Sequence, residues 1–311
     1  MESSAGVLII PVYRSASGIP QLLERLKEIV AAAPVKLSCM FVIDGSPDQA
    51  KEILVRDLPS AGLRGKIVTL SRNFGAFEAI RAGLQLAEGD YFAIMAADCQ
   101  EPASLMIDFF RVLHKDEADL VLGQREKRED PLMSVLPASI FWRLFRRIAI
   151  SSAPASGIDV FGCNRRVRDT LVSMHELNSS LIGMLLWVGY RRKMIGYERQ
   201  SRASGRSSWT FSKKFKYFAD SLYGFSDLPI RLLTLLGVVG LLFSIVLTLV
   251  TVFAKVTGII PIPGYAATIS VVSLFGGLNC FGLGILGGYL WRTFENTKGR
   301  PLYIVNDVIE F

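Results

Sequence analysis

The chain has 311 residues, 50% of them hydrophobic, which is enough to bury a sizeable core and still supply membrane spans. The formal net charge is +7. Four cysteines without a CxxC pair and only two histidines argue against a structural zinc site and fit a reducing compartment. No basic segment precedes the apolar stretch at the N-terminus, so we expect no cleaved signal peptide.

Residues 1–210 alternate between short apolar runs and stretches with helical apolar spacing. The runs predict strands at 7–11, 37–43, 66–70, 91–96 and 120–122, and the spacing predicts helices at 19–33, 74–87 and 104–114. Strands that alternate with helices form a mostly parallel sheet. We therefore predict an α/β fold for a cytoplasmic domain at 1–210, with ligands beyond the C-terminal strand ends.

The most informative polar residues stand directly after predicted strands: Asp44 after the second, Arg72 and Asn73 after the third, Asp98 and Gln100 after the fourth. Asp44 is either a turn residue or an acceptor for a nucleobase or ribose. The Arg72–Asn73 pair either starts a helix or contacts a nucleotide. In an extended segment residues two apart point the same way, so Asp98 and Gln100 would offer oxygen ligands to Mg²⁺ or Mn²⁺. The alternative is an exposed loop.

Two long uncharged apolar runs, 232–254 and 265–291, follow the domain. A helix of this length rises about 30–35 Å, enough to cross a bilayer core, whereas a buried soluble helix rarely stays uncharged for so long. Basic residues flank the pair and the connection carries only Lys255, so we expect a multi-pass inner (plasma) membrane protein with both termini cytoplasmic. The basic residues before the first run are Arg191, Arg192, Lys193, Arg199, Arg202, Arg206, Lys213, Lys214 and Lys216.

The segment at 211–230 places aromatic side chains at near-helical spacing among lysines, which predicts an amphipathic helix in the membrane interface. Because the basic cluster adjoins a span, anionic headgroups or phosphates are favoured over nucleic acid as partners. The hairpin is then 231–292, and 293–311 is a cytoplasmic tail. Small residues let helices approach closely, so the glycines of the second run predict a homo-oligomer. These glycines are Gly276, Gly277, Gly282, Gly284, Gly287 and Gly288.

The order of the short motifs is more specific than any one of them. They are PVYR (11–14), VIDGSPD (42–48), LSRNFG (70–75), AEGDY (87–91), MAADCQEP (95–102), GQR (123–125), SGIDVFGCNRRV (156–167) and RQSRASGRSSW (199–209). Together with the C-terminal hairpin, this set resembles the family 2 inverting glycosyltransferases of GT-A fold. More narrowly, it resembles the polyisoprenyl-phosphate glycosyltransferases, which include dolichyl-phosphate mannose synthase and bacterial bactoprenol glucosyltransferases. The resemblance covers essentially the whole chain.

On the donor side, the resemblance implies a nucleotide-sugar site and a metal. Pro11 and Tyr13 match the opening nucleotide-binding turn, and Asp44 matches the second carboxylate of an Asp-Asp-Gly-Ser motif. Asp98 and Gln100 match the later ligands of an Asp-x-Asp-x-Gln motif that holds Mg²⁺ or Mn²⁺. The implied nucleotide-sugar-binding residues are Pro11, Tyr13, Asp44, Arg72, Asn73 and Asp98.

On the acceptor side, the resemblance implies contacts with phosphate. Arg125 matches a phosphate-contacting arginine, and the basic segment near the membrane matches one that engages phosphates. The implied catalytic residues are Asp98, Arg125 and Arg202, and the implied lipid-phosphate site comprises Arg199, Arg202, Ser207 and Lys213. A phosphate acceptor is already an anion and needs no general base, so Asp159 is interpreted as an orienting or structural residue.

The leading hypothesis is inverting transfer of one sugar from a nucleotide-sugar to undecaprenyl phosphate, for a cell-envelope glycan. Family frequency favours a UDP-sugar such as UDP-glucose. Ile43 and Ala96 stand where the family has Asp, and they support the alternative of a catalytically degenerate partner in a glycan assembly complex. A processive synthase is disfavoured because the Gln-x-x-Arg-Trp sequence is absent, and a transporter because the spans lack ionisable residues.

Overall fold

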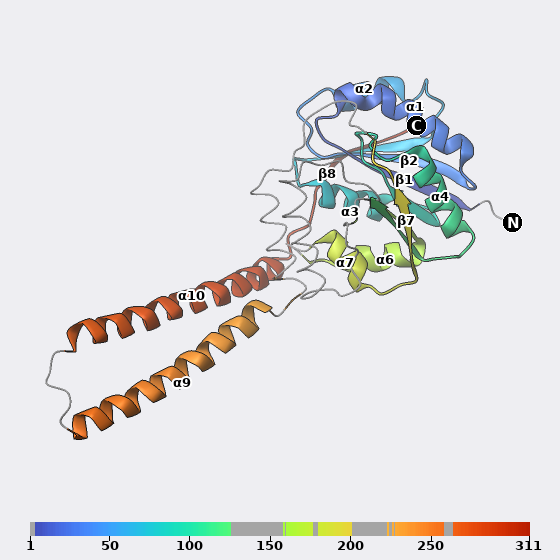
Figure 1. Ribbon diagram of the computed structural model, residues 1–311. Coiled ribbons are helices and arrows are strands. Elements are labelled where there is room, and N and C mark those ends of the chain that lie inside the picture. The colour runs from blue at the N-terminus through green and yellow to red at the C-terminus, as the bar shows by residue number, and fades with distance from the viewer. Residues whose placement is uncertain are drawn as a thin grey trace.

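The apolar runs near the N-terminus become the central strands of one mixed sheet (Figure 1). The computed structural model describes residues 4–125, 158, 160–176, 180–200, 223, 226, 228–257 and 264–311. Four parallel strands lie side by side in the order β4-β1-β2-β3. They are β1 (Ala5–Val12), β2 (Lys36–Ile43), β3 (Gly65–Leu70) and β4 (Tyr91–Ile94).

Later segments extend the sheet on both sides. The described strands lie in the order β7-β5-β6-β4-β1-β2-β3-β8. The added strands are β5 (Leu120–Arg125), β6 (Phe161–Asn164), β7 (Arg192–Tyr197) and β8 (Val305–Glu310). Strand β6 is antiparallel to β4 and to β5, and β7 is parallel to β5. Strands β1 to β5 and β7 therefore run the same way, and their C-terminal ends meet at one edge of the sheet.

Helices cover both faces of this sheet, as a parallel arrangement requires (Figure 1). One face carries α1 (Ile19–Ala32), α2 (Ala50–Asp57) and α4 (Ala103–His114). The other carries α3 (Ala76–Leu86), α6 (Arg165–Ser173) and α7 (Leu181–Trp187). The strands and helices expected from the pattern of the first 122 residues are confirmed, with small differences at their ends.

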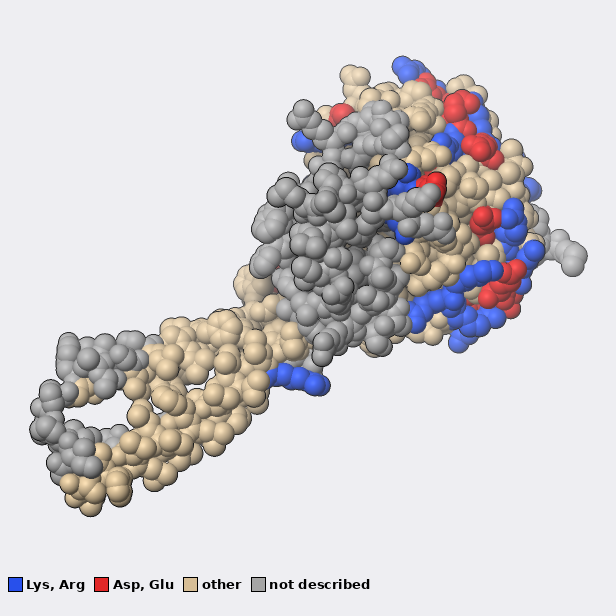
Figure 2. Space-filling model, in the orientation of Figure 1, with Lys and Arg blue, Asp and Glu red and all other residues tan. Residues whose placement is uncertain are grey.

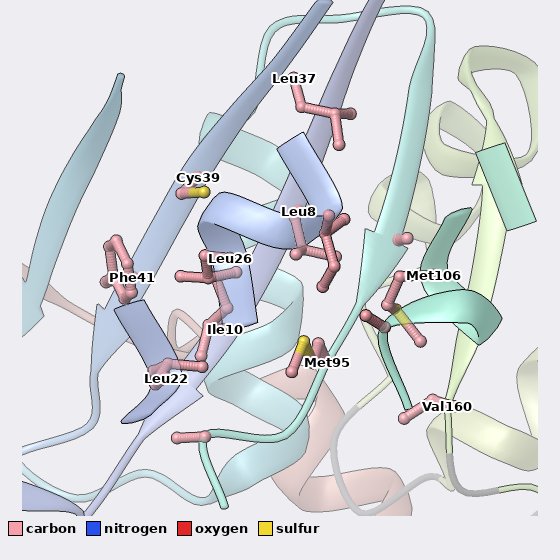
Figure 3. Packing of buried hydrophobic residues seen from close by; sticks show 14 of the residues in the cluster. Leu8, Ile10, Leu22, Leu26, Leu37, Cys39, Phe41, Met95, Met106 and Val160 are labelled. Carbon is pink, nitrogen blue, oxygen red and sulfur yellow. The ribbon is translucent and has the colours of Figure 1, made fainter. Parts of the chain in front are cut away.

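Strand β1 divides its apolar side chains between the two cores, because alternate residues of a strand point to opposite faces. Leu8 and Ile10 pack with Leu22 and Leu26 of α1 (Figure 3), whereas Ile9 enters the core beneath α3. All five side chains are fully buried. Burial of one such side chain contributes about 1.5–3 kcal/mol, so the central strand anchors both layers.

A hairpin of two long helices, α9 (Leu228–Val256) and α10 (Tyr265–Thr297), extends away from the domain (Figure 1). Each helix is long and apolar enough to cross a membrane, with mean hydropathies of 2.5 and 1.3 in the best segments. Almost none of these residues is buried inside the protein, as the 59% exposure of Leu242 illustrates. The visible, described surface of the hairpin is nearly free of charge, except near the domain (Figure 2).

Aromatic and basic side chains gather where the hairpin meets the domain. The rings of Tyr223 and Tyr289 contact edge to face at 4.9 Å, and the Arg292 guanidinium lies 4.9 Å from the Tyr223 ring. The Lys298 ammonium lies 5.0 Å from the Trp291 ring. Tyrosine, tryptophan and basic residues are typical of the membrane–water interface, so this end of the hairpin has the chemistry of the headgroup region.

One part of the predicted organisation differs from the structure, and another lies mostly outside the described residues. The segment assigned to a cytoplasmic tail, 293–311, continues α10 to Thr297 and then forms β8, which pairs antiparallel with β3. The interfacial helix expected at 211–230 lies mostly outside the described residues, and α9 already begins at Leu228. Strands β6, β7 and β8 were not predicted. Their sequences are short and mix polar with apolar residues, and their pairing with distant strands determines them.

Candidate active site

Asp44, directly after β2, organises the loop that follows β3. Its side chain is buried, and its carboxylate accepts hydrogen bonds from the backbone N–H of Phe74 at 2.7 Å and of Gly75 at 2.9 Å. The Asn73 amide donates to the same carboxylate at 3.0 Å. Burial raises the pKa of the Asp44 carboxyl, while these backbone donors and the Arg72 charge oppose the rise. Asp44 therefore holds the loop at 71–75 in place.

The next residues of the same turn hold the loop after β1. Ser46 accepts a hydrogen bond from the Arg14 N–H at 2.7 Å and donates to Asp48 at 2.5 Å. Asp48 in turn accepts from the Ala16 N–H at 2.8 Å. Arg14 has φ +52°, an uncommon conformation for a residue with a side chain, and these bonds fix it. Sequence reasoning did not single out Ser46 and Asp48, although both lie within the VIDGSPD motif.

Gly45 lets these two loops approach each other. It has φ +55°, and a Cβ at this position would lie 2.3 Å from the carbonyl carbon of Arg72 and the nitrogen of Asn73. Any other residue would push the loop after β3 away from the turn after β2. The short VIDGSPD segment thus sets the spacing of both neighbouring loops.

The structure brings the sequence-predicted donor residues together at this edge. Pro11 lies in β1, in register with Val42 of β2, and Tyr13 follows the end of β1. Tyr13 is half-buried beneath the Arg14 guanidinium, which lies 5.4 Å from its ring. Arg72 is exposed and lies 4.1 Å from the Phe74 ring. The edge therefore offers aromatic, amide and cationic groups side by side.

The segment after β4 does not have the extended conformation that the sequence argument assumed. Cys99, between Asp98 and Gln100, has φ +54°, so the chain turns there. Asp98 stays partly exposed, and its carboxylate accepts weakly from the Gln100 N–H at 3.4 Å. Burial raises the pKa of the Cys99 thiol to about 11, which keeps it protonated and unsuited to nucleophilic chemistry.

Gln100 is buried and turned toward a segment one hundred residues further along the chain. Its side-chain oxygen accepts a hydrogen bond from the Arg199 guanidinium, and its amide N–H donates to the Gln200 carbonyl at 3.3 Å. The Gln200 N–H donates back to the Gln100 carbonyl at 2.9 Å. Arg25 of α1 completes the connection, since it donates to the Glu101 carbonyl and to the Gln200 side chain.

The residues at this loop fit a divalent cation only with help from a ligand. Asp98 supplies one carboxylate, Ala96 supplies none, and the oxygen of Gln100 already accepts from Arg199. Within the described ranges no group of three His, Cys, Asp or Glu side chains is placed to hold a metal. Mg²⁺ is commonly bound by one or two carboxylates plus substrate phosphates, which is the kind of site this set can complete.

The predicted acceptor residues are described only in part. Arg125 ends β5 in register with Tyr197 of β7, two residues before Arg199, so both arginines lie at the sheet edge that carries Asp98. Arg202, Ser207 and Lys213 lie outside the described residues, as does Asp159. Ile43, at a position where the resemblance expects a carboxylate, is buried in the core and adds no charge to the site.

Comparisons with known proteins agree with this architecture. Residues 7–172 match the glycosyl transferase family 2. The chain is 30% identical to the uncharacterized glycosyltransferase YkcC of Bacillus subtilis, over 96% of this chain and 92% of that protein. It is 27% identical to the bactoprenol glucosyl transferase of Shigella phage SfX, over 96% and 97% of the two chains.

The fold also resembles a solved glycosyltransferase structure. It superimposes on glucosyl-3-phosphoglycerate synthase from Mycobacterium tuberculosis with a TM-score of 0.50 and 15% identity, covering 72% of this chain and 81% of that one. At this identity the likeness concerns the fold alone. From the match over more than half of its length and from its relatives, the chain belongs to glycosyl transferase family 2 and is a glycosyltransferase of GT-A type fold.

Proposed function

We propose that the protein transfers one sugar from a UDP-sugar to a polyprenyl phosphate at the cytoplasmic face of the inner (plasma) membrane, with inversion at the anomeric carbon. One observation carries the proposal. The Ser71 N–H donates at 2.9 Å to the carbonyl of Ile304, in the segment that leaves the membrane hairpin. This hydrogen bond holds the loop of the proposed donor site next to the segment that follows the hairpin. Such an arrangement is expected of an enzyme whose acceptor lies in the bilayer. The name of the phage SfX relative supports this acceptor class, and glucose as the sugar.

The proposed reaction requires stabilisation of the negative charges on the acceptor and the donor rather than proton transfer. The acceptor phosphate is already an anion, so no general base is needed. Arg125 and Arg199 supply cations at the ends of β5 and β7, where they would hold the acceptor phosphate and the donor diphosphate together. A divalent cation, Mg²⁺ or Mn²⁺, held by Asp98 with the donor, would stabilise the leaving nucleoside diphosphate.

The remaining acceptor contacts and the assembly are part of the same proposal. Arg202, Ser207 and Lys213 are proposed to bind the lipid phosphate, because they follow Arg199 toward the membrane in sequence. We also propose a homo-oligomer that forms through α10. The competing function is a silent partner that binds donor or lipid without transfer, and the loss of carboxylates at Ile43 and Ala96 is its support.

A transfer assay separates these functions. Purified full-length protein is incubated with undecaprenyl phosphate, Mg²⁺ or Mn²⁺, and a panel of radiolabelled nucleotide sugars. The proposal predicts a labelled lipid with one donor, loss of the label in Asp98→Ala, and normal labelling in Asp57→Asn, a partly exposed control at the end of α2. Absence of product with every donor, in protein that still binds UDP, would favour the silent partner.

A further inference from the structure

The interaction between Gln100 and Arg199 joins the two halves of the site. Gln100 belongs to the loop after β4, which carries Asp98, and Arg199 belongs to the segment that leads from β7 toward the membrane. Gln100 is 8% exposed, and the oxygen and nitrogen of its side-chain amide bond to residues 199 and 200 respectively. A rotation that moves the Gln100 side-chain oxygen would therefore break its hydrogen bond with Arg199.

Arg199 is held by a weak partner. Among the residues that the structure describes, its guanidinium bonds to the neutral amide oxygen of Gln100 and pairs with no carboxylate. A charged phosphate oxygen is a stronger acceptor for a guanidinium than an amide oxygen is. Arg199 also lines a pocket of about 380 Å³ between the first two turns of α4 and residues 195–200, so there is open space beside its side chain.

An amide oxygen that accepts from a guanidinium is a poorer ligand for a divalent cation, because two cations at contact distance repel each other. We propose that Gln100 and Arg199 form a latch. In the empty enzyme Gln100 binds Arg199; when donor and cation are loaded, Gln100 turns its oxygen to the cation and releases Arg199 toward the phosphate of the acceptor. The latch rests on the proposed function. It adds an order of binding, in which the donor prepares the site for the lipid phosphate.

The latch predicts that Mn²⁺ and the acceptor each raise the binding affinity of the other. Loading with UDP and Mn²⁺ frees Arg199, so it should raise the affinity for a phosphate monoester acceptor, and the acceptor should raise the affinity for Mn²⁺ by the same factor. Removal of the Arg199 charge should tighten Mn²⁺ binding in the absence of acceptor, because the Gln100 oxygen then no longer accepts from a guanidinium and is available to the cation. The mutual enhancement of Mn²⁺ and acceptor binding, and the effect of removing the Arg199 charge, should both be absent in Gln100→Ala.

The first test measures Mn²⁺ binding to full-length protein in detergent with UDP present, by electron paramagnetic resonance, with no turnover. Arg199→Gln should bind Mn²⁺ about 5-fold or more tightly than wild type. Gln100→Ala should bind it more weakly, and Arg199→Gln added to Gln100→Ala should have no further effect. Thermal unfolding of each variant establishes that it is folded.

Arg25→Gln is the matched control, since Arg25 is a neighbouring cation that bonds to Glu101 and Gln200 but not to Gln100. Equal tightening in Arg25→Gln and Arg199→Gln would mean a general charge effect and would overturn the latch. Unchanged Mn²⁺ affinity in Arg199→Gln, or additive effects in the double variant, would overturn it as well.

The second test measures binding of farnesyl phosphate with and without UDP and Mn²⁺. Wild type should bind it about 5-fold more tightly when loaded, and Arg199→Gln should show no enhancement. Inorganic phosphate in the same assay separates a lipid headgroup from a free anion. A wild-type enzyme that forms labelled lipid yet shows no enhancement retains the proposed function and loses the latch, so the two can fail separately.

Discussion

Asp44 and Asn73 are bonded to each other twice: the Asn73 amide donates to the Asp44 carboxylate at 3.0 Å and to the Asp44 carbonyl at 3.1 Å. These bonds connect the ends of β2 and β3, and they direct the Asp44 carboxylate toward the protein backbone. The effect of Asp44 on a donor is therefore expected to pass through the loop at 71–75.

The first prediction follows from this geometry. In Asp44→Asn an NH₂ group replaces one acceptor oxygen and faces N–H donors of the loop, so we expect the free energy of unfolding to fall by about 1–3 kcal/mol. UDP affinity should fall in parallel. Chemical denaturation and UDP titration check this, with Asp57→Asn as the partly exposed control. An unchanged unfolding free energy with lost UDP binding would instead make Asp44 a direct contact.

Much of the fold could be predicted because its central strands carry their own signal. A run such as residues 7–10 is apolar throughout, and only burial on both faces explains that pattern. Strand β8 has no such signal, since its conformation depends on pairing with β3, more than two hundred residues earlier. The order of strands at the other edge, β7-β5-β6, depends in the same way on distant partners.

The location of the candidate residues at one edge of the sheet was predictable, but their contacts were not. Strand ends indicated Asp44, Asn73 and Asp98, because the ends of parallel strands meet at one edge. The pairing of Gln100 with Arg199 was not predictable, since it depends on a positive φ at Cys99 and on the path of a segment one hundred residues later. Neither leaves a local pattern in the sequence.

The second prediction concerns the metal. Asp98 should be the dominant protein ligand, because Ala96 cannot contribute an oxygen. Asp98→Ala should abolish transfer while the protein still folds. Ala96→Asp restores the family carboxylate at a partly exposed position and should preserve activity or lower the cation concentration it needs. Transfer rate against Mg²⁺ and Mn²⁺ concentration measures both, and near-normal rates in Asp98→Ala would refute the assignment.

A third prediction addresses how β7 is held. Asp119, which is buried, accepts hydrogen bonds from the Arg191 guanidinium at 3.0 and 3.1 Å and from the Asn164 amide at 2.9 Å. The Arg191 hydrogen bonds hold the pKa of Asp119 below its usual value. A lowered folded pKa gives stability that is present above the unfolded pKa and is lost as the pH falls through the folded one.

Asp119→Asn should therefore destabilise the protein at pH 7, and the difference from wild type should shrink as the pH falls below about 4. Asp116→Asn is the control, because Asp116 contacts the same arginine but is exposed. Thermal unfolding across pH measures how much less stable Asp119→Asn and Asp116→Asn are than wild type. A wild-type advantage that is constant from pH 7 to low pH would contradict the role of the charge.

The fourth prediction concerns assembly through α10. A Cβ added at Gly277 or Gly284 would meet no atom within 4 Å, so the helix surface at these two glycines is uncovered. A Cβ at Gly282 would instead meet Leu233 of α9 at 3.0 Å. Gly284→Leu should shift the protein toward monomer, because a bulky side chain prevents close helix approach. Light scattering in mild detergent measures the mass, with Leu283→Ile as control. A wild-type monomer there and in nanodiscs would defeat the idea.

The last prediction concerns topology. Basic residues flank the hairpin on the domain side, so the connection around Gly264 should lie on the outer side of the membrane. Cys280 is exposed in α10 and the other cysteines are buried, so Gly264→Cys in a Cys280→Ser background gives one accessible thiol. An impermeant maleimide should label it in right-side-out vesicles but not in inverted ones. Ser60→Cys in the domain should behave in the opposite way, and labelling of both from the same side would overturn the hairpin.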